Sequence, residues 1–283
     1  MEFTPGGKPV ILQSVSVRFT SKQKDNTHSD PFAFTASILR KLKLDSNRQY
    51  PVGISFSQPF TMPNPDNQRD IRMTMSAKGW NLDRFIGRNL YDIFQQAIAN
   101  EGFNNLDVLF ISNDIACAHL ASFDAQFALI TGTGFGFSFK DANHRIHVVE
   151  AGEFVSPEMD LTDYDMYYHY APFAKRACEK MISGLYLWKN IRIASQGKNK
   201  AEVTHDRIRR AGRHIGAMLG ALADKDGFSG KIHIVADGAL IRKLAVMRQA
   251  IKDELSPYEV VLEVLENAPL IGCGLAALQQ GNL

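Results

Sequence analysis

Residues 127–139 read Phe-Ala-Leu-Ile-Thr-Gly-Thr-Gly-Phe-Gly-Phe-Ser-Phe. The first part, Phe127 to Ile130, is apolar and of strand length, as expected for a strand in a sheet covered on both faces. Gly132 and Gly134 follow, and Phe137-Ser138-Phe139 then alternates like a second strand rather than a helix. The stretch therefore predicts a strand, a glycine turn and a returning strand.

The glycine turn admits two interpretations. Without side chains in the way, its backbone N–H groups can converge on an anion such as phosphate. A dinucleotide fingerprint or a Walker loop would instead open a helix, and no Gly-Lys-Ser/Thr ending is present. Taken by itself, a pair of glycines here is more often a plain hairpin turn than a phosphate site.

Around this stretch the sequence alternates between strand and helix patterns. Asp30 followed by Pro31 predicts the start of a helix, which Phe34, Ile38 and Leu42 continue at every fourth residue. Further strands are expected at Val15–Phe19, Val52–Phe56, Leu106–Ile111 and Ile232–Ala236, and further helices at Leu82–Asn100, Phe173–Arg192, Arg207–Ala223 and Leu240–Leu255. The fold class is α/β.

Composition sets limits on the partners. A formal net charge of +2 and 22% charged residues give no reason to expect nucleic acid as a partner. Three widely spaced cysteines fit a reducing compartment better than a disulfide framework. The N-terminus lacks a signal-peptide pattern, and no segment is apolar over the length of a membrane span. We therefore expect a cytoplasmic protein with no membrane partner; the oligomeric state is left open.

One segment points to a family. Residues 179–187 read Glu-Lys-Met-Ile-Ser-Gly-Leu-Tyr-Leu, which resembles the Glu-Lys-Met-Ile-Ser-Gly-x-Tyr-Leu signature of the hexokinase family. Other pieces similar to that family occur in its order: Gly53–Pro59, Ser76–Trp80, Asn113-Asp114, Thr131–Gly134, Glu150–Phe154, Ile234–Gly238 and Gly272–Ala277. The resemblance runs from about Gly53 to the end.

The resemblance implies the two-domain architecture of actin-like ATPases, with a cleft between domains. The small domain would cover residues 1–112 and the large domain residues 113–283. It also implies an ATP-dependent hexose kinase that phosphorylates the 6-hydroxyl of glucose or a related hexose. In that reading Asp114 is the general base that takes the proton of the attacking hydroxyl, and Lys78 is a second catalytic residue.

The resemblance also assigns binding residues. The hexose would be held by Ser57, Lys78, Asn113, Asp114, Glu150 and Glu179, a mixture of donors and acceptors that suits a polyhydroxylated ring. ATP phosphates would lie on Thr131, Gly132, Thr133 and Gly134. The adenosine would lie on Asp237, Gly238 and Ala239 and on Gly272 and Gly274, at the start of a last helix. Mg²⁺ would bridge the phosphates, and no protein metal ligand is assigned.

Other interpretations stay open. The family's first strand ends in Asp-x-Gly-Gly-Thr, whereas this chain has only Thr4-Pro5-Gly6-Gly7-Lys8, so the first hairpin is expected to be missing. A catalytically impaired sugar-binding or regulatory relative is therefore the alternative, and another sugar kinase of the same fold is a third. Outside the resemblance, Asp114 would serve as a helix N-cap, Lys78 as part of a surface turn and Glu179 as a solvated helix position.

Overall fold

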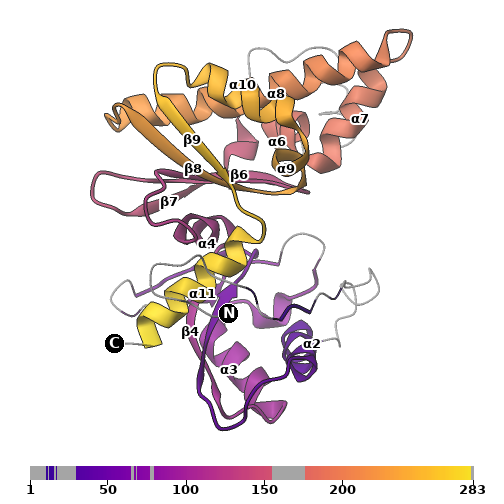
Figure 1. Ribbon diagram of the computed structural model, residues 1–283. Helices are drawn as coiled ribbons and strands as arrows, with labels where there is room; N and C mark the ends of the chain where they lie inside the picture. The colour runs from indigo at the N-terminus through magenta and orange to yellow at the C-terminus, as the bar shows by residue number, and fades with distance from the viewer. Residues whose placement is uncertain are drawn as a thin grey trace. The chain divides into compact units, whose positions relative to one another are not determined.

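The computed structural model describes residues 11, 13–15, 17, 30–64, 67, 69–76, 80–154 and 176–281 (Figure 1). The chain divides into two compact units. The first consists of residues 1–114 and 270–283, and the second of residues 115–269. Residues 270–283 thus group with the first unit, whereas the sequence analysis assigned them to the second domain.

The second unit is built on a five-stranded mixed sheet with the strand order β7-β6-β5-β8-β9. β5 is antiparallel to β6 and parallel to β8, and β6–β7 and β8–β9 extend the sheet on either side. The strands are β5 (Phe127–Thr131), β6 (Phe135–Lys140), β7 (Ile146–Val149), β8 (Lys231–Asp237) and β9 (Glu259–Val264). The glycine turn predicted from the sequence is confirmed, because it joins β5 to β6.

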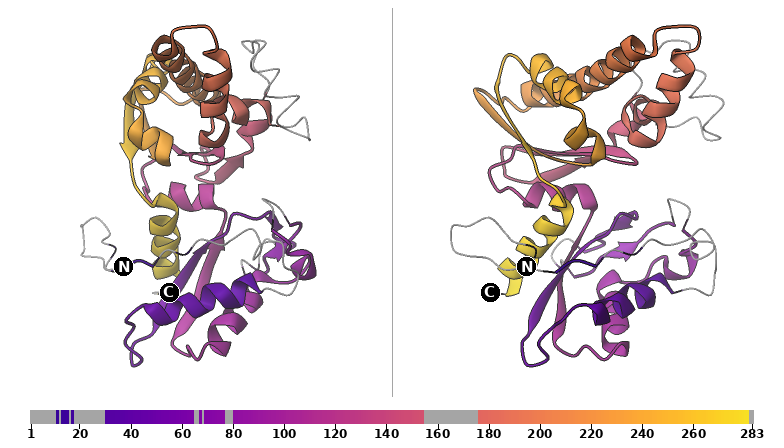
Figure 2. Two further views of the ribbon diagram at one scale, coloured as in Figure 1. Left: turned by 90° about the vertical axis from the view of Figure 1, so that its right-hand side faces the viewer. Right: turned by 45° about the vertical axis from the view of Figure 1, so that its right-hand side comes forward.

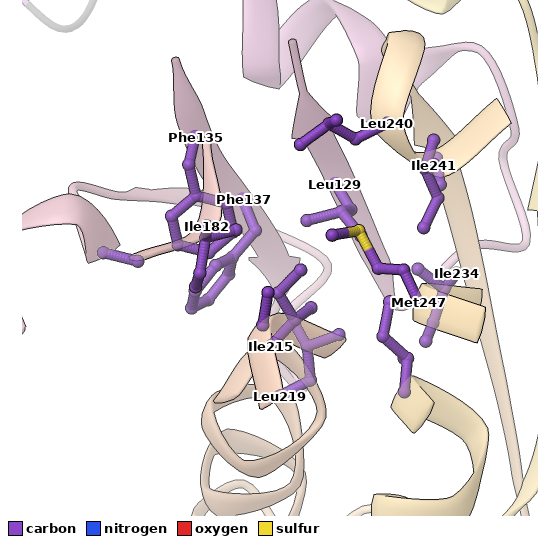
Figure 3. Packing of buried hydrophobic residues seen from close by; sticks show 14 of the residues in the cluster. Leu129, Phe135, Phe137, Ile182, Ile215, Leu219, Ile234, Leu240, Ile241 and Met247 are labelled. Carbon is purple, nitrogen blue, oxygen red and sulfur yellow. The ribbon is translucent and has the colours of Figure 1, made fainter. Parts of the chain in front are cut away.

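Helices cover both faces of this sheet. Phe127 and Leu129 of β5 pack with Leu219 of α8, while Ala128, which points to the opposite face, packs with Ala118 of α4. Figure 3 shows the larger core, where Leu129, Ile215 and Met247 lie close together. The helices are α4 (Asp114–Leu120), α6 (Ala177–Ile182), α7 (Gly184–Ala194), α8 (Lys200–Lys225), α9 (Ala239–Lys243) and α10 (Ala245–Glu254), with the 3₁₀ turn η3 (Ala151–Glu153).

Glycines let α8 and α10 pack closely, and the two helices lie together on one face of the sheet (Figures 1 and 2). A Cβ on Gly212 would come within 2.6 Å of the carbonyl oxygen of Met247, and one on Gly216 within 2.6 Å of Glu254 Cβ. Both positions, one turn apart on α8, therefore require glycine.

The first unit contains a parallel strand pair, β1 (Tyr50–Ser55) and β4 (Leu106–Ser112), and a short antiparallel pair, β2 (Phe60–Thr61) and β3 (Arg72–Met73). Its helices are α2 (Pro31–Ile38), α3 (Leu90–Asn100) and α11 (Ala268–Gly281), with the 3₁₀ turns η1 (Leu39–Lys41) and η2 (Asp83–Phe85). α2 and α3 pack together, and Phe32 meets Phe85 and Phe94 edge to face at 4.7 and 4.9 Å between ring centres.

The C-terminal helix α11 packs against the parallel strands β1 and β4. It contacts residues of these strands that do not belong to the core formed with α2 and α3. A Cβ on Gly53 of β1 would come within 2.0 Å of the carbonyl oxygen of Cys273, and a Cβ on Gly281 within 3.1 Å of Leu109 in β4. Leu109 is not part of the core that α2 and α3 form, so α11 covers the other face of the strand pair (Figure 2). Only glycine at position 53 allows this close approach.

Several predicted elements are confirmed and several boundaries were wrong. Asp30 caps α2 as predicted, since its Oδ1 accepts bonds from Phe32 N at 2.9 Å and Ala33 N at 3.0 Å. The helix predicted over Leu82–Asn100 begins only at Leu90, and the one predicted over Leu240–Leu255 is interrupted at Leu244, whose backbone is extended.

Of the other predicted segments, some are confirmed and some are not. The region of Phe173–Arg192 holds two helices, α6 and α7, where its residues are described. Val15 and Val17 are described but lie in no strand, and Phe19 lies outside the described residues. Among the residues that the structure describes, every helix is too short or too polar to cross a lipid bilayer.

Candidate functional site

Three predicted site residues lie at one edge of the first unit. β1 and β4 are parallel, with Ser55 opposite Ser112, and Phe56 N donates to Ser112 O at 2.8 Å. Ser57 follows the end of β1, and Asn113 and Asp114 follow the end of β4. The carboxyl ends of neighbouring parallel strands are the usual position of ligand-binding residues in α/β sheets.

Asp114 is the first residue of α4 and is separated from the end of β4 by Asn113 alone. Its carboxylate therefore lies in the first helical turn, where the helix dipole favours a negative charge.

Ser57 also lines a cavity of about 210 Å³ in the first unit. Its wall is mainly apolar and includes four aromatic residues, Phe32, Phe56, Trp80 and Phe94. Gln58 lines the same cavity and is buried. Lys78, predicted to bind the hexose and to assist catalysis, lies outside the described residues.

In the second unit the glycine hairpin and the Asp237–Ala239 turn lie side by side. β5 and β8 are parallel, with Ile130 opposite Asp237. Thr131 Oγ1 accepts a hydrogen bond from Ile241 N at 3.2 Å, and a Cβ on Gly238 would come within 2.2 Å of Thr131 O. The hairpin predicted to hold the phosphates and the Asp237–Ala239 turn predicted to hold the adenosine thus meet at the carboxyl ends of two neighbouring strands.

The Asp237 carboxylate is held by an arginine. Arg242 Nη1 lies 2.6 Å from Asp237 Oδ1, and the same nitrogen lies 3.7 Å from Glu266 Oε1. The side chain of Asp237 is only 12% exposed, so this charge-assisted bond fixes its orientation at the turn.

The hairpin also contacts the predicted sugar-binding glutamate of α6. A Cβ on Gly134 would lie 3.0 Å from Glu179 Oε1, and one on Gly152 would lie 3.1 Å from Glu179 Cβ. Glu179 is buried rather than solvated, and Arg176 pairs with both Glu179 and the second predicted glutamate, Glu150. The structure therefore brings Glu150, Glu179 and the hairpin together.

Gly272 and Gly274 occupy a different position from the one expected. α11 begins at Ala268, so both glycines lie within the helix rather than at its start. They flank Cys273, whose carbonyl approaches Gly53 of β1 in the first unit. This close approach explains the glycine at position 53 of β1.

Two groups near these elements have strongly shifted pKa values. Burial lowers the pKa of His119 on α4 to about 4, and its ring lies 2.9 Å from Ser138 Oγ and 3.0 Å from Ala125 O. Burial, with the neighbouring charge of Glu179, raises the pKa of Cys178 to about 12. Both groups are therefore uncharged at neutral pH.

Sequence reasoning missed Arg176 and the contact at Gly184. Arg176 precedes Glu179 by three residues, a spacing at which helical side chains meet, so that pair was open to prediction. Gly184 N donates to Gly132 O at 2.8 Å, which joins α7 to the hairpin, and no local pattern signals such a contact. Within the described ranges, no three His, Cys, Asp or Glu side chains gather to hold a metal ion.

Comparison with known proteins gives the family context. Residues 5–123 match the family model of hexokinase. The chain is 26% identical over 192 residues to hexokinase-10 of Oryza sativa subsp. japonica, covering 60% of this chain and 38% of the relative. It is 25% identical over 188 residues to hexokinase-2 of Rattus norvegicus, covering 59% of this chain and 20% of the relative. The chain thus spans less than half the length of these relatives.

Solved structures show the fold. A hexokinase from Schistosoma mansoni complexed with glucose superposes with a TM-score of 0.73 at 14% identity, covering 94% of this chain and 79% of that one. A putative sugar kinase from Cytophaga hutchinsonii gives 0.55 at 17% identity, covering 91% and 89%. The family-model match begins well before Gly53, where the sequence resemblance was first seen. The chain therefore has the α/β fold of hexokinases and related sugar kinases, and its resemblance to the hexokinase family is confirmed.

Proposed function

We propose that this protein is an ATP-dependent hexose kinase that transfers the γ-phosphoryl group of ATP to the 6-hydroxyl of glucose or a related hexose. The observation that carries the proposal is the position of Ser57, Asn113 and Asp114 at the carboxyl ends of the parallel strands β1 and β4. The match of residues 5–123 to the hexokinase family covers all three.

Asp114 is the proposed general base. Its carboxylate accepts the proton of the sugar hydroxyl as that oxygen attacks the γ-phosphorus, and ADP leaves. Ser57, Lys78, Asn113, Glu150 and Glu179 are the proposed contacts of the hexose. Glutamate oxygens accept hydrogen bonds from hydroxyl groups, whereas serine and asparagine both donate and accept.

ATP is assigned to the hairpin of residues 131–134 and the turn of Asp237–Ala239. A Cβ on Gly132 would meet no atom within 4 Å, so the hairpin backbone is open there, as a phosphate cradle requires. Gly272 and Gly274 remain part of the proposed nucleotide site on the resemblance alone. When bound, Mg²⁺ offsets the charge of the ATP phosphates, and we assign it no protein ligand.

The proposal includes a reducing compartment such as the cytoplasm. Cys117, Cys178 and Cys273, which are all the cysteines of the chain, are buried and form no disulfide with one another.

Titration calorimetry with glucose, and separately with ATP and Mg²⁺, is combined with a coupled assay for ADP. The wild-type protein is expected to bind both ligands and to produce ADP in the presence of glucose. Asp114→Asn should retain glucose binding and lose at least about 100-fold in kcat, as general-base catalysis requires. Asp107→Asn is the matched control, because Asp107 is an exposed carboxylate on the same strand, β4.

The outcomes separate the candidate functions. Glucose binding without nucleotide binding or turnover would assign the chain to the alternative, a sugar-binding or regulatory relative. Full activity of Asp114→Asn would refute Asp114 as the base.

A further inference from the structure

Arg176 lies between two carboxylates of the second unit. Its Nη1 is 3.2 Å from Glu179 Oε2 and its Nη2 is 3.5 Å from Glu150 Oε2. Neither the family model, which ends at residue 123, nor the resemblance seen in the sequence gives Arg176 a role. Its side chain is 48% exposed, so the guanidinium remains within reach of a bound molecule.

The backbone holds Arg176 in an unusual conformation. Its φ is 71°, in the left-handed region that residues other than glycine rarely occupy. Arg176 is the N-cap residue of α6, and its carbonyl accepts a bond from Lys180 N at 3.3 Å. In this conformation the side chain of Arg176 reaches both glutamates.

The two glutamates differ in their freedom. The side chain of Glu179 is 11% exposed, and its other oxygen, Oε1, lies against Gly134 of the hairpin. The side chain of Glu150 is 68% exposed. One guanidinium thus pairs with both carboxylates, so its removal would take away one positive charge that faces them.

We infer that Arg176 determines the specificity of the sugar site by balancing the charge of Glu150 and Glu179, so that the site prefers a neutral hexose to a hexose carrying an ammonium group. The inference rests on the proposed function, because it takes the two glutamates as contacts of the hexose. A carboxylate pair without its guanidinium attracts a cation, whereas a balanced pair accepts hydroxyl groups with little bias.

The test measures the dissociation constants of glucose and of glucosamine by calorimetry, at a pH where the amine is protonated. In Arg176→Gln the ratio of the glucosamine to the glucose constant should fall about tenfold, since one nearby charge has been removed. Arg176→Lys keeps the charge and should keep the ratio. 2-Deoxyglucose, which lacks the 2-hydroxyl without adding charge, separates the loss of that hydroxyl from the charge effect.

Two further variants keep the test decisive. Glu150→Gln removes a negative charge from an exposed side chain, so it should fold, and the same ratio should rise. Arg145→Gln is the matched control, because Arg145 also pairs with a carboxylate, Asp141, at 3.2 Å, but on the β6–β7 hairpin. Its ratio should equal that of wild type.

The results distinguish this inference from the proposed function. Equal weakening of both sugars in Arg176→Gln, with an unchanged ratio in Glu150→Gln, would show a merely structural arginine and overturn the inference while leaving the kinase proposal intact. Should Arg176→Gln fail to fold, the ratio in Glu150→Gln decides alone. A wild-type protein that binds neither sugar would overturn both proposals.

Discussion

Gly238 lies directly against the backbone of Thr131, so that a Cβ at position 238 would come within 2.2 Å of the Thr131 carbonyl oxygen. The φ of Gly238 is +117°, which side chains disfavour even without a neighbour. This single contact joins the hairpin after β5 to the turn after β8, the two segments proposed to hold the nucleotide.

Gly238→Ala is therefore expected to lower the free energy of unfolding by about 3 kcal/mol or more, because it adds a clash to an unfavourable φ. Urea unfolding measures this, and calorimetry should show weaker ATP binding. Gly230→Ala is the control: Gly230 also has a positive φ, +76°, but a Cβ there would meet nothing within 4 Å, so about 1 kcal/mol is expected. Equal losses for the two variants would argue against the clash.

The glycines of α8 make a second prediction. Gly212→Ala should destabilise the protein by about 2 kcal/mol, since its methyl group would meet Met247 O at 2.6 Å and Ala250 Cβ at 2.8 Å. Gly220→Ala, two turns further along, should stabilise it by up to about 1 kcal/mol, because its Cβ meets only Leu255 Cδ2 at 3.4 Å and alanine favours a helix. Thermal unfolding of both variants should show shifts of opposite sign.

Buried His119 predicts a pH dependence of stability. Its pKa is about 4 in the folded chain, against an ordinary value of 6.5, so the folded state binds the proton less readily than the unfolded state. The contribution of His119 to the free energy of unfolding is therefore fully present above pH 6.5 and is lost as the pH falls towards 4. Between pH 7 and pH 5 the loss is about 2 kcal/mol.

Urea unfolding at the two pH values checks this. His119→Gln should be less stable at pH 7 and should depend less on pH, whereas exposed His205→Gln should keep the wild-type dependence. If the free energy of unfolding of His119→Gln changed with pH as much as that of wild type, the pH dependence would have to come from other groups.

The three cysteines should resist modification in the native protein. All are buried, which restricts the access of a reagent to their thiols, and burial with the charge of Glu179 raises the pKa of Cys178 to about 12, so Cys178 forms almost no thiolate at pH 8. Ellman's reagent should react slowly with the native chain and fully in guanidinium chloride. Ser195→Cys, in the turn after α7, supplies a reactive control; rapid reaction of native wild type would contradict the packing.

Much of the fold was open to prediction because local chemistry determined it. Asp30 and Pro31 start α2 through a cap and a fixed φ, and the glycines after Ile130 turn a hairpin. The start of α3 was misplaced because a 3₁₀ turn at Asp83–Phe85 and Gly87, with φ +79°, precede it, and an apolar pattern does not register these interruptions. β9 was not predicted at all, and it is placed by pairing with β8.

The candidate site also combines features that local sequence patterns predict with features that only tertiary packing creates. Ser57, Asn113 and Asp114 could be placed at strand ends, since strand ends are visible in an apolar pattern. The contacts of Gly134 with Glu179 and of Gly53 with Cys273 join residues far apart in the chain, and only tertiary packing creates them. Whether Asp114 acts as a base stays a prediction.

The packing of α11 on β1 and β4 has a consequence for the order of folding. The chain leaves the first unit at Asp114 and returns to it only at Leu270, so one face of its strand pair is completed by a helix that is synthesised after the whole second unit. On the ribosome the second unit, which is continuous in sequence, is available to fold as a whole before the first can close. The strands β1 and β4 are thus made before the second unit but completed only after it, so the strand surface that α11 covers stays exposed while residues 115–269 are synthesised.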